Sequence, residues 1–184
     1  MARILHQSGL PLDEALCLVS TRAIPSRSMD GLKETDLHQL YAAQLADARQ
    51  AEARAAESFH DMAMVANDET VASLFRAAAA ESSVQLTRVE RLMRVAQRPP
   101  GPGTASPDLR SDLVTNATDN DLLKAASDSV THQIENYEAA CATSRQLGDY
   151  MALDVLLLNL DEERSTLAAL AWQISRQSGM LRAI

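Results

Sequence analysis

The sequence predicts an all-α protein, a ferritin-like four-helix bundle with one long crossover and a short extra helix at its N-terminus. Three observations lead to this prediction. Apolar residues recur every three or four positions along four long segments, which is the spacing of amphipathic helices. Most prolines and glycines lie between these segments. Only 3% of the 184 residues are aromatic, so the core must be built from Ala, Leu, Val and Met, which suit closely packed helices.

The first two predicted helices, residues 32–66 and 69–97, form a pair. No proline or glycine interrupts the first of them, and Tyr41 and Phe59 share one helical face within it. The segment Asn67–Thr70 supplies a turn and an N-cap for the second helix. Because this turn is short, we expect the two helices to pack side by side and antiparallel.

Residues 98–119 connect the two halves of the chain. They hold four of the six prolines and two of the six glycines, so the first half of this segment cannot be helical. A linker between two domains would leave each helical pair without a partner. About 20 extended residues reach roughly 65 Å, whereas a helix of ~27 residues is about 40 Å long. The segment is therefore interpreted as a crossover from one end of a single bundle to the other.

The third and fourth predicted helices, residues 120–147 and 150–177, form a second pair. Gly148 lies between them and suits the left-handed conformation that often ends a helix. The predicted bundle thus covers residues 32–178, and residues 179–184 form a tail. Two antiparallel pairs joined by one long crossover are the ferritin-like version of a four-helix bundle.

Residues 1–31 are expected to carry a short amphipathic helix around the apolar patch Ala15–Val19. Asp13 and Glu14 interrupt this region, so it makes a poor signal peptide. No apolar run approaches the ~20 residues that cross a bilayer. The net charge of −8 argues against nucleic acid as a partner, because binding a phosphate backbone requires a basic face. We expect a cytoplasmic protein.

Several polar residues fall on or beside the predicted apolar faces. Glu163 lies between Leu160 and Leu167, in the middle of the face of the fourth helix. A lone carboxylate there is costly to ionise, so it should be paired, protonated or bound to a metal ion. Glu138 lies on the flank of its face, whereas Glu135 is nearer the opposite side and is interpreted as a surface charge. The other inward polar candidates are Gln44, Glu52, Ser82, Gln85 and Tyr137, with Glu81 at the edge.

A carboxylate-bridged di-metal site in such a bundle uses two single glutamates and two Glu-x-x-His pairs. One Glu-x-x-His occurs, from Glu57 to His60, but Glu57 is rotated most of the way round the helix from Tyr41. A surface location is therefore favoured for this pair. The two cysteines, Cys17 and Cys141, have no metal-like spacing.

Four stretches carry a resemblance to a known family: LHQLYAAQ (Leu37–Gln44), FRAAAAESSVQLTRVE (Phe75–Glu90), IENYEAA (Ile134–Ala140) and RQLGDYMALDVLLLNLDEER (Arg145–Arg164). On these stretches the chain resembles, from about Leu32 to Ala171, the YciE/YciF-like ferritin-like family of bacterial stress-associated proteins, whose function is unknown. The resemblance implies the ferritin-like fold and a homodimer.

Most of the metal ligands that the resemblance implies are replaced here. Gln44 stands where the family has a glutamate, and Ala80 and Ser83 stand in the positions of a glutamate and of a histidine that some members carry. Leu167 replaces an aspartate. The ligand candidates that remain are Glu138 and Glu163, then Glu81 at the margin, with Glu135 and Glu162 less favoured. Two or three carboxylates without an inward histidine are too few for a tight pair of transition-metal ions.

The sequence therefore favours a degenerate di-metal site without a cofactor and a non-enzymatic, stress-associated structural or protein-binding role. The alternative is a metal-dependent ferritin-like protein that binds iron or manganese and handles iron or peroxide with an incomplete ligand set. The alanine-rich surfaces of the first two helices and the family resemblance lead us to expect a homodimer. A third interpretation is an adaptor that binds a protein partner through residues 1–31.

Overall fold

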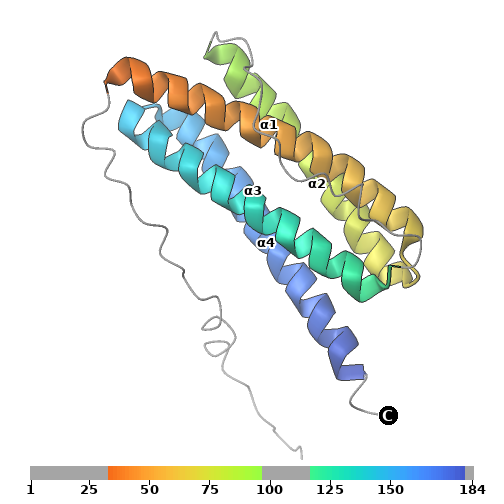
Figure 1. The fold of residues 1–184 in the computed structure, drawn as a ribbon. Helices are drawn as coiled ribbons and strands as arrows, with labels where there is room; N and C mark the ends of the chain where they lie inside the picture. Colours follow the sequence, from red (N-terminus) through yellow and green to blue (C-terminus); the bar gives the residue numbers. More distant parts are fainter. Residues whose placement is uncertain (1–32, 97–116, 181–184) are drawn as a thin grey trace, which may run out of the picture. The chain divides into compact units, whose positions relative to one another are not determined.

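The computed structural model describes residues 33–96 and 117–180, which form four α-helices (Figure 1). The helices are α1 (Glu34–Val65), α2 (Glu69–Val95), α3 (Asp119–Leu147) and α4 (Tyr150–Met180). No strand occurs in these two ranges, so the all-α prediction is confirmed. Each helix boundary lies within three residues of the predicted one. The helix expected in residues 1–31 and most of the crossover lie outside the described residues.

The four helices pack as two antiparallel pairs. α1 contacts α2 and α3, and α4 contacts α3 and α2 (Figure 1). The start of α3 lies at the α1–α2 turn, because the Asp119 carboxylate accepts hydrogen bonds from the backbone N–H groups of Asn67 (2.8 Å) and Asp68 (2.9 Å). The end of α2 and the start of α3 therefore lie at opposite ends of the bundle. Helix ends placed in this way are joined by one long crossover in ferritin-like bundles.

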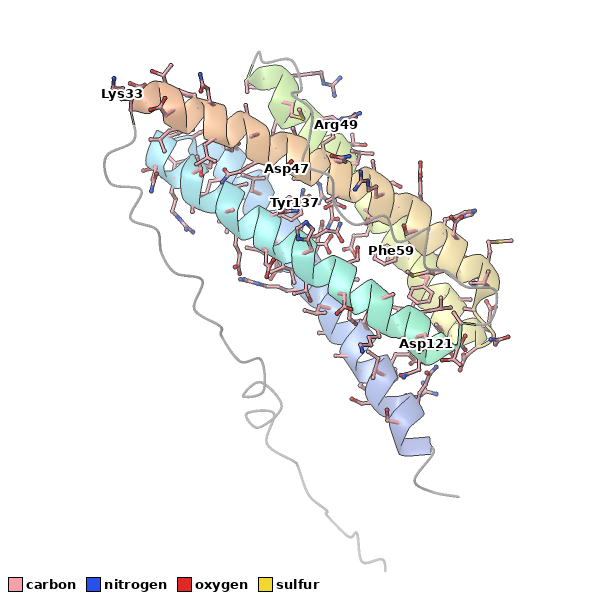
Figure 2. All side chains as sticks on the ribbon, in the orientation of Figure 1. Lys33, Asp47, Arg49, Phe59, Asp121 and Tyr137 are labelled. Carbon is pink, nitrogen blue, oxygen red and sulfur yellow. The ribbon has the colours of Figure 1, made fainter. Side chains whose placement is uncertain are left out.

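Local capping signals account for where the helices begin and end. The Asp68 carboxylate accepts from the Thr70 N–H (2.7 Å) at the start of α2. Thr118 and Asp121 form a reciprocal capping box at the start of α3, where Figure 2 marks Asp121. Gly148 ends α3 in the left-handed conformation, with φ 68°, as its glycine identity predicts.

The core consists of two apolar clusters at successive levels of the bundle. One cluster contains Tyr41, Leu45, Val89, Cys141, Leu153, Leu156 and Leu160 among its buried residues. The other contains Phe59, Met62, Val71, Phe75, Leu122, Leu123, Val130 and Leu170, and its two phenylalanine rings stack with centroids 6.3 Å apart. Within the described ranges, no helix is long and apolar enough to cross a membrane.

Candidate functional site

A layer of buried polar side chains lies between the two apolar clusters, with contributions from all four helices. We call it the polar layer. Its members are Glu52 from α1, Ser82 and Gln85 from α2, Gln133 and Tyr137 from α3, and Asn159 and Glu163 from α4, each at most 3% exposed. Each of them continues the inward stripe of its helix at a spacing of three or four residues from buried apolar neighbours. The layer is therefore built into the helical pattern.

Glu52 is the best-connected side chain of the polar layer. It is completely buried, and its Oε1 accepts a hydrogen bond from the Tyr137 hydroxyl (2.7 Å). Its Oε2 accepts one from Gln133 Nε2 (2.9 Å). Figure 2 shows Tyr137 at the middle of the bundle, between α1 and the other helices. Both carboxylate oxygens of Glu52 are thus engaged by protein donors.

The hydrogen bonds continue from Glu52 toward the surface between α2 and α4. The Tyr137 hydroxyl accepts from Asn159 Nδ2 (3.0 Å), and Asn159 Oδ1 accepts from Arg88 Nη1 (3.0 Å). Arg88 also pairs with Glu162, and both side chains are about one quarter exposed, at 28% and 24%. The polar layer therefore has one edge in contact with solvent, where a charge pair closes the network.

Burial raises the pKa of both carboxyl groups in the polar layer. Desolvation raises the pKa of Glu52 to about 7. Hydrogen bonds from Tyr137, Ser82 and Gln133 stabilise the ionised form and limit this rise. For Glu163 the pKa rises to about 9, first through burial and then through the neighbouring carboxyl groups of Glu52 and Glu81. The two buried carboxyl groups therefore retain at least one proton between them at neutral pH.

Two buried amide oxygens in the polar layer have no hydrogen-bond partner among the described residues: Gln85 Oε1 and Gln133 Oε1. The other end of the Gln85 amide donates to Glu162 (3.3 Å). A protonated Glu163 is a donor and lies within hydrogen-bonding reach of the Gln85 side chain, so the proton that burial keeps on it gives Gln85 Oε1 a complementary group nearby. The layer is thus rich in acceptors and depends on the protonated state of its carboxyl groups.

The inward polar residues expected from the sequence fall at different depths. Ser82, Gln85 and Tyr137 all belong to the polar layer. Gln44 is only half-buried, although its Oε1 atom is enclosed and has no hydrogen-bond partner among the described residues. Glu81 lies at the edge of the layer, where it accepts from the Thr166 hydroxyl (2.8 Å).

Glu138 is not in the polar layer, contrary to the inward position expected for it. Its side chain is 39% exposed and accepts from Arg164 Nη2 (2.8 Å). The neighbouring Tyr137 takes the inward position on α3, and one residue along a helix turns the side chain by about 100°. Glu135 is a surface residue with a side chain that is 59% exposed, and its Oε2 atom lies 3.9 Å from Nδ1 of His132. Glu162 pairs with Arg88 at the rim.

Ala80 and Ser83 on α2, for which the resemblance implied a glutamate and a histidine in the family, are both exposed. The inward residues at this level are Ser82 and Gln85, which keep the same i, i+3 spacing. Leu167 is partly buried and packs against the second apolar cluster. The interior of α2 thus presents a hydroxyl and an amide where a Glu-x-x-His pair would supply a carboxylate and an imidazole.

Three residues of the network were not predicted as inward polar residues: Arg88, Gln133 and Asn159. Two of them had a signal in the sequence. Gln133 follows Val130 by three and Asn159 follows Leu156 by three, so each lies on a buried stripe. No sequence signal indicated Arg88, because it joins the network only through its hydrogen bonds to Glu162 and Asn159 on α4.

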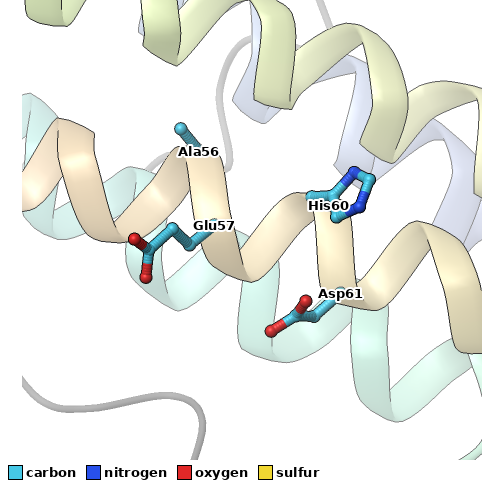
Figure 3. Close-up of a pocket in the computed structure, with 4 residues that line it drawn as sticks. All are labelled: Ala56, Glu57, His60 and Asp61. Carbon is cyan, nitrogen blue, oxygen red and sulfur yellow. The ribbon is translucent and has the colours of Figure 1, made fainter.

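The Glu-x-x-His sequence on α1 lies on the outer surface. Glu57 and His60 are exposed and, with Ala56 and Asp61, line a shallow depression (Figure 3). The carboxylates of Glu57 and Asp61 project away from the imidazole of His60 in this view. No group of three or more His, Cys, Asp or Glu side chains in the described ranges is arranged to hold a metal ion.

The chain is therefore a four-helix bundle with one long crossover, whose centre is a hydrogen-bonded layer of carboxyl, amide and hydroxyl groups. It belongs to the family described as Domain of unknown function (DUF892), whose model matches residues 36–178.

Solved structures with the same fold support this assignment. The Escherichia coli stress protein YciF is 19% identical, with a TM-score of 0.66, and the alignment covers 78% of this chain and 97% of YciF. YcfI from Rhodopseudomonas palustris is also 19% identical, with a TM-score of 0.65 and coverage of 78% and 96%. No curated protein gives a significant match. The resemblance to YciF-like proteins that the sequence indicated is thus confirmed.

Proposed function

We propose that this protein is a non-enzymatic, stress-associated bundle with a structural or protein-binding role, in which a hydrogen-bonded polar layer replaces a di-metal centre. The association with stress rests on YciF, described as a stress protein. For YcfI a structural role has been suggested. A role without redox chemistry agrees with both descriptions.

One observation carries the proposal: both oxygens of the Glu52 carboxyl group accept hydrogen bonds from protein donors. Tyr137 and Gln133 each direct a hydrogen toward one of these oxygens. A cation bound to the same oxygens would meet the positive ends of both donors at close range. The polar layer also contains no histidine or cysteine, the ligands that give borderline metals such as iron and zinc their strong sites. The donor set does not fit a pair of iron ions.

Metal analysis tests the proposal. The full chain is purified without chelators and without a metal-affinity tag, and iron, manganese and zinc are counted per chain. We expect values near zero and no rise in melting temperature when iron(II) or manganese(II) is added, because a ligand stabilises only the state that binds it.

The competing function is a metal-dependent ferritin-like protein, favoured by the electrostatic proximity of Glu52, Glu81 and Glu163. It requires one or two metal equivalents per chain and a rise in melting temperature that Glu163→Gln abolishes. The exposed Glu135→Gln serves as the matched control, which should leave any such rise intact. This combination of results would refute the non-enzymatic proposal.

A further inference from the structure

Helix α4 carries large apolar side chains on its outer side as well as on its inner side. Leu156, Leu160 and Leu170 are buried in the core. On the outer side of the first half of the helix, four large apolar residues are exposed: Tyr150 (66%), Met151 (81%), Leu157 (38%) and Leu158 (48%). Large exposed apolar residues that gather on one side of a helix mark a surface that another molecule covers.

The four exposed residues form two lines along the helix, and two aspartates lie between these lines. Residues seven positions apart on an α-helix lie almost directly above each other. The two lines are therefore Tyr150 with Leu157, and Met151 with Leu158. Asp154 and Asp161 are exposed and are also seven residues apart, and at about 100° per residue they fall between the two apolar lines. We call these six residues the acidic α4 face.

The two carboxylates of the acidic α4 face are not paired within the bundle. Neither Asp154 nor Asp161 forms a side-chain hydrogen bond or ion pair with another described residue. No basic residue occurs anywhere in residues 149–161. Arg164 follows Asp161 by three, but it already pairs with Glu138 on α3. The face therefore combines apolar surface with two uncompensated negative charges.

The place of these aspartates indicates the chemistry of the molecule that covers the face. A partner that packs against both apolar lines also covers the carboxylates between them, and a covered charge is costly unless it is paired. The partner must therefore supply cations at the spacing of Asp154 and Asp161. An amphipathic helix with arginine or lysine at two positions seven residues apart, between apolar side chains, meets both requirements. The same face of a second copy would bring two more aspartates instead.

We propose that the acidic α4 face binds a basic amphipathic helix of another protein, whose cationic side chains pair with Asp154 and Asp161. This inference rests on the protein-binding role proposed above, to which it gives a surface and a partner chemistry. Residues 150–161 span about 18 Å of helix, which is short for a stable interface, so binding should be reversible. The net charge of −8 favours the approach of a basic partner.

Two synthetic amphipathic helices serve as probes for this face. Both have the same leucine pattern, and one carries arginine at two positions seven residues apart where the other carries glutamate. Each peptide is labelled with a fluorescent dye and titrated with the full chain, and fluorescence anisotropy measures binding. We expect the arginine peptide to bind at least about tenfold more tightly than the glutamate peptide. Its affinity should fall as salt is added, because salt screens the charge pairs.

Charge reversal tests whether the two aspartates select the partner. In the double variant Asp154→Arg, Asp161→Arg we expect the preference to reverse, so that the glutamate peptide binds more tightly. The matched control is Asp128→Arg, Glu135→Arg, which changes the net charge equally. Its two positions are exposed on α3 and are also seven residues apart. This control should keep the wild-type preference.

A second variant tests the apolar contacts separately from charge. Met151→Ser, Leu158→Ser keeps both aspartates and removes one apolar line, so we expect the arginine peptide to bind at least about tenfold more weakly. Its control is Met64→Ser, Val84→Ser, at positions 74% and 50% exposed on α1 and α2, and it should bind as the wild type does. If a variant fails to fold, hydrogen exchange in the wild type decides, because the arginine peptide should slow exchange in residues 150–161.

Several results would overturn the inference: equal affinity for the two peptides, a charge-reversal variant that keeps the wild-type preference, or a control that changes it equally. Absence of protection in residues 150–161 would do the same. A face already occupied by a second copy would bind the peptide only as a dimer dissociates, which light scattering detects and which would also contradict the inference. Metal counts decide the proposed function and do not enter these measurements, so either proposal can fail without the other.

Discussion

Glu163 occupies a position where a negative charge is especially costly, because it is 3% exposed and close to two other carboxyl groups, Glu52 and Glu81. Its pKa rises from 4.5 to about 9 in the folded state. Between these two values the folded protein holds a proton that the unfolded chain releases. The free energy of unfolding therefore falls as pH rises through this window, by up to about 1.4 kcal/mol per pH unit for one proton.

We predict that Glu163→Gln makes this pH dependence shallower. Glutamine imitates the protonated carboxyl group and cannot ionise, so the variant should be more stable than the wild type at pH 8 and above. A smaller slope should remain at lower pH, because the pKa of Glu52 is also raised, to about 7. Urea unfolding between pH 6 and pH 9 measures both slopes.

The exposed Glu135→Gln is the control for this experiment and should follow the wild-type curve. Equal slopes for the wild type and Glu163→Gln would show that Glu163 is ionised in the folded protein. The charge would then need a compensating group in the interior, which would revive the metal-dependent alternative.

At this scale the sequence predicted residues at the centre of a helical face more reliably than residues on its flank. Glu163 is central on its stripe, and its burial followed from Leu160 and Leu167. Tyr137 was likewise expected on the inward face of α3 and is buried. Glu138 lies on the flank of that face, and its side chain pairs at the surface with Arg164 of α4. That partner lies on another helix, so periodicity within α3 cannot supply it.

Among the helices, the ends were predictable because their causes are local. Asp68, Thr118 and Gly148 each cap a helix through atoms at most a few residues away. The Asp119 contact is different, because its partners Asn67 and Asp68 are 52 and 51 residues distant. No pattern within α3 indicates that Asp119, its first residue, binds the turn that precedes another helix.

We predict that Asp119→Ala lowers the free energy of unfolding by about 1–2 kcal/mol. The substitution leaves two backbone N–H groups at the α1–α2 turn without their acceptor and releases the end of the crossover from that turn. Urea unfolding at neutral pH measures the loss. The control is Asp128→Ala, which removes the same charge from an exposed position on α3 and should change stability by less than about 0.5 kcal/mol.

A loss of equal size in both aspartate variants would mean that net charge, and not the Asp119 contact, controls stability. No loss in Asp119→Ala would mean that water replaces the carboxylate at this turn. The α3 end of the crossover would then need another anchor.

For the bundle formed by the described residues, the polar layer divides one long core into two apolar clusters. A bundle with a uniform apolar interior could shift one helix along another by a turn at small cost. Here such a shift would place Glu52 or Asn159 against leucine and leave its hydrogen-bonding groups unpaired. The layer therefore selects one axial alignment of four helices, in the way that a single buried asparagine specifies the register of a coiled coil.

The last prediction compares partial with complete removal of the polar network. Tyr137→Phe alone deprives Glu52 of a donor and Asn159 of an acceptor, so we expect a loss of about 1–3 kcal/mol in the free energy of unfolding. The variant that combines Glu52→Leu, Gln133→Leu, Tyr137→Phe and Asn159→Leu removes the mutually bonded groups together. Because few buried groups are left unpaired, we expect it to be at least as stable as the wild type.

Urea unfolding measures the stability of both variants, and its m-value and the dispersion of amide NMR signals report whether one packed state survives. The matched control is Tyr150→Phe, since Tyr150 is 66% exposed and its hydroxyl lies outside the network. If the fourfold variant is stable but shows a lower m-value and poorly dispersed signals, the layer contributes alignment more than stability. If it is less stable than Tyr137→Phe, the buried hydrogen bonds are themselves a net source of folding free energy. A bundle in which they contribute only alignment would then be excluded.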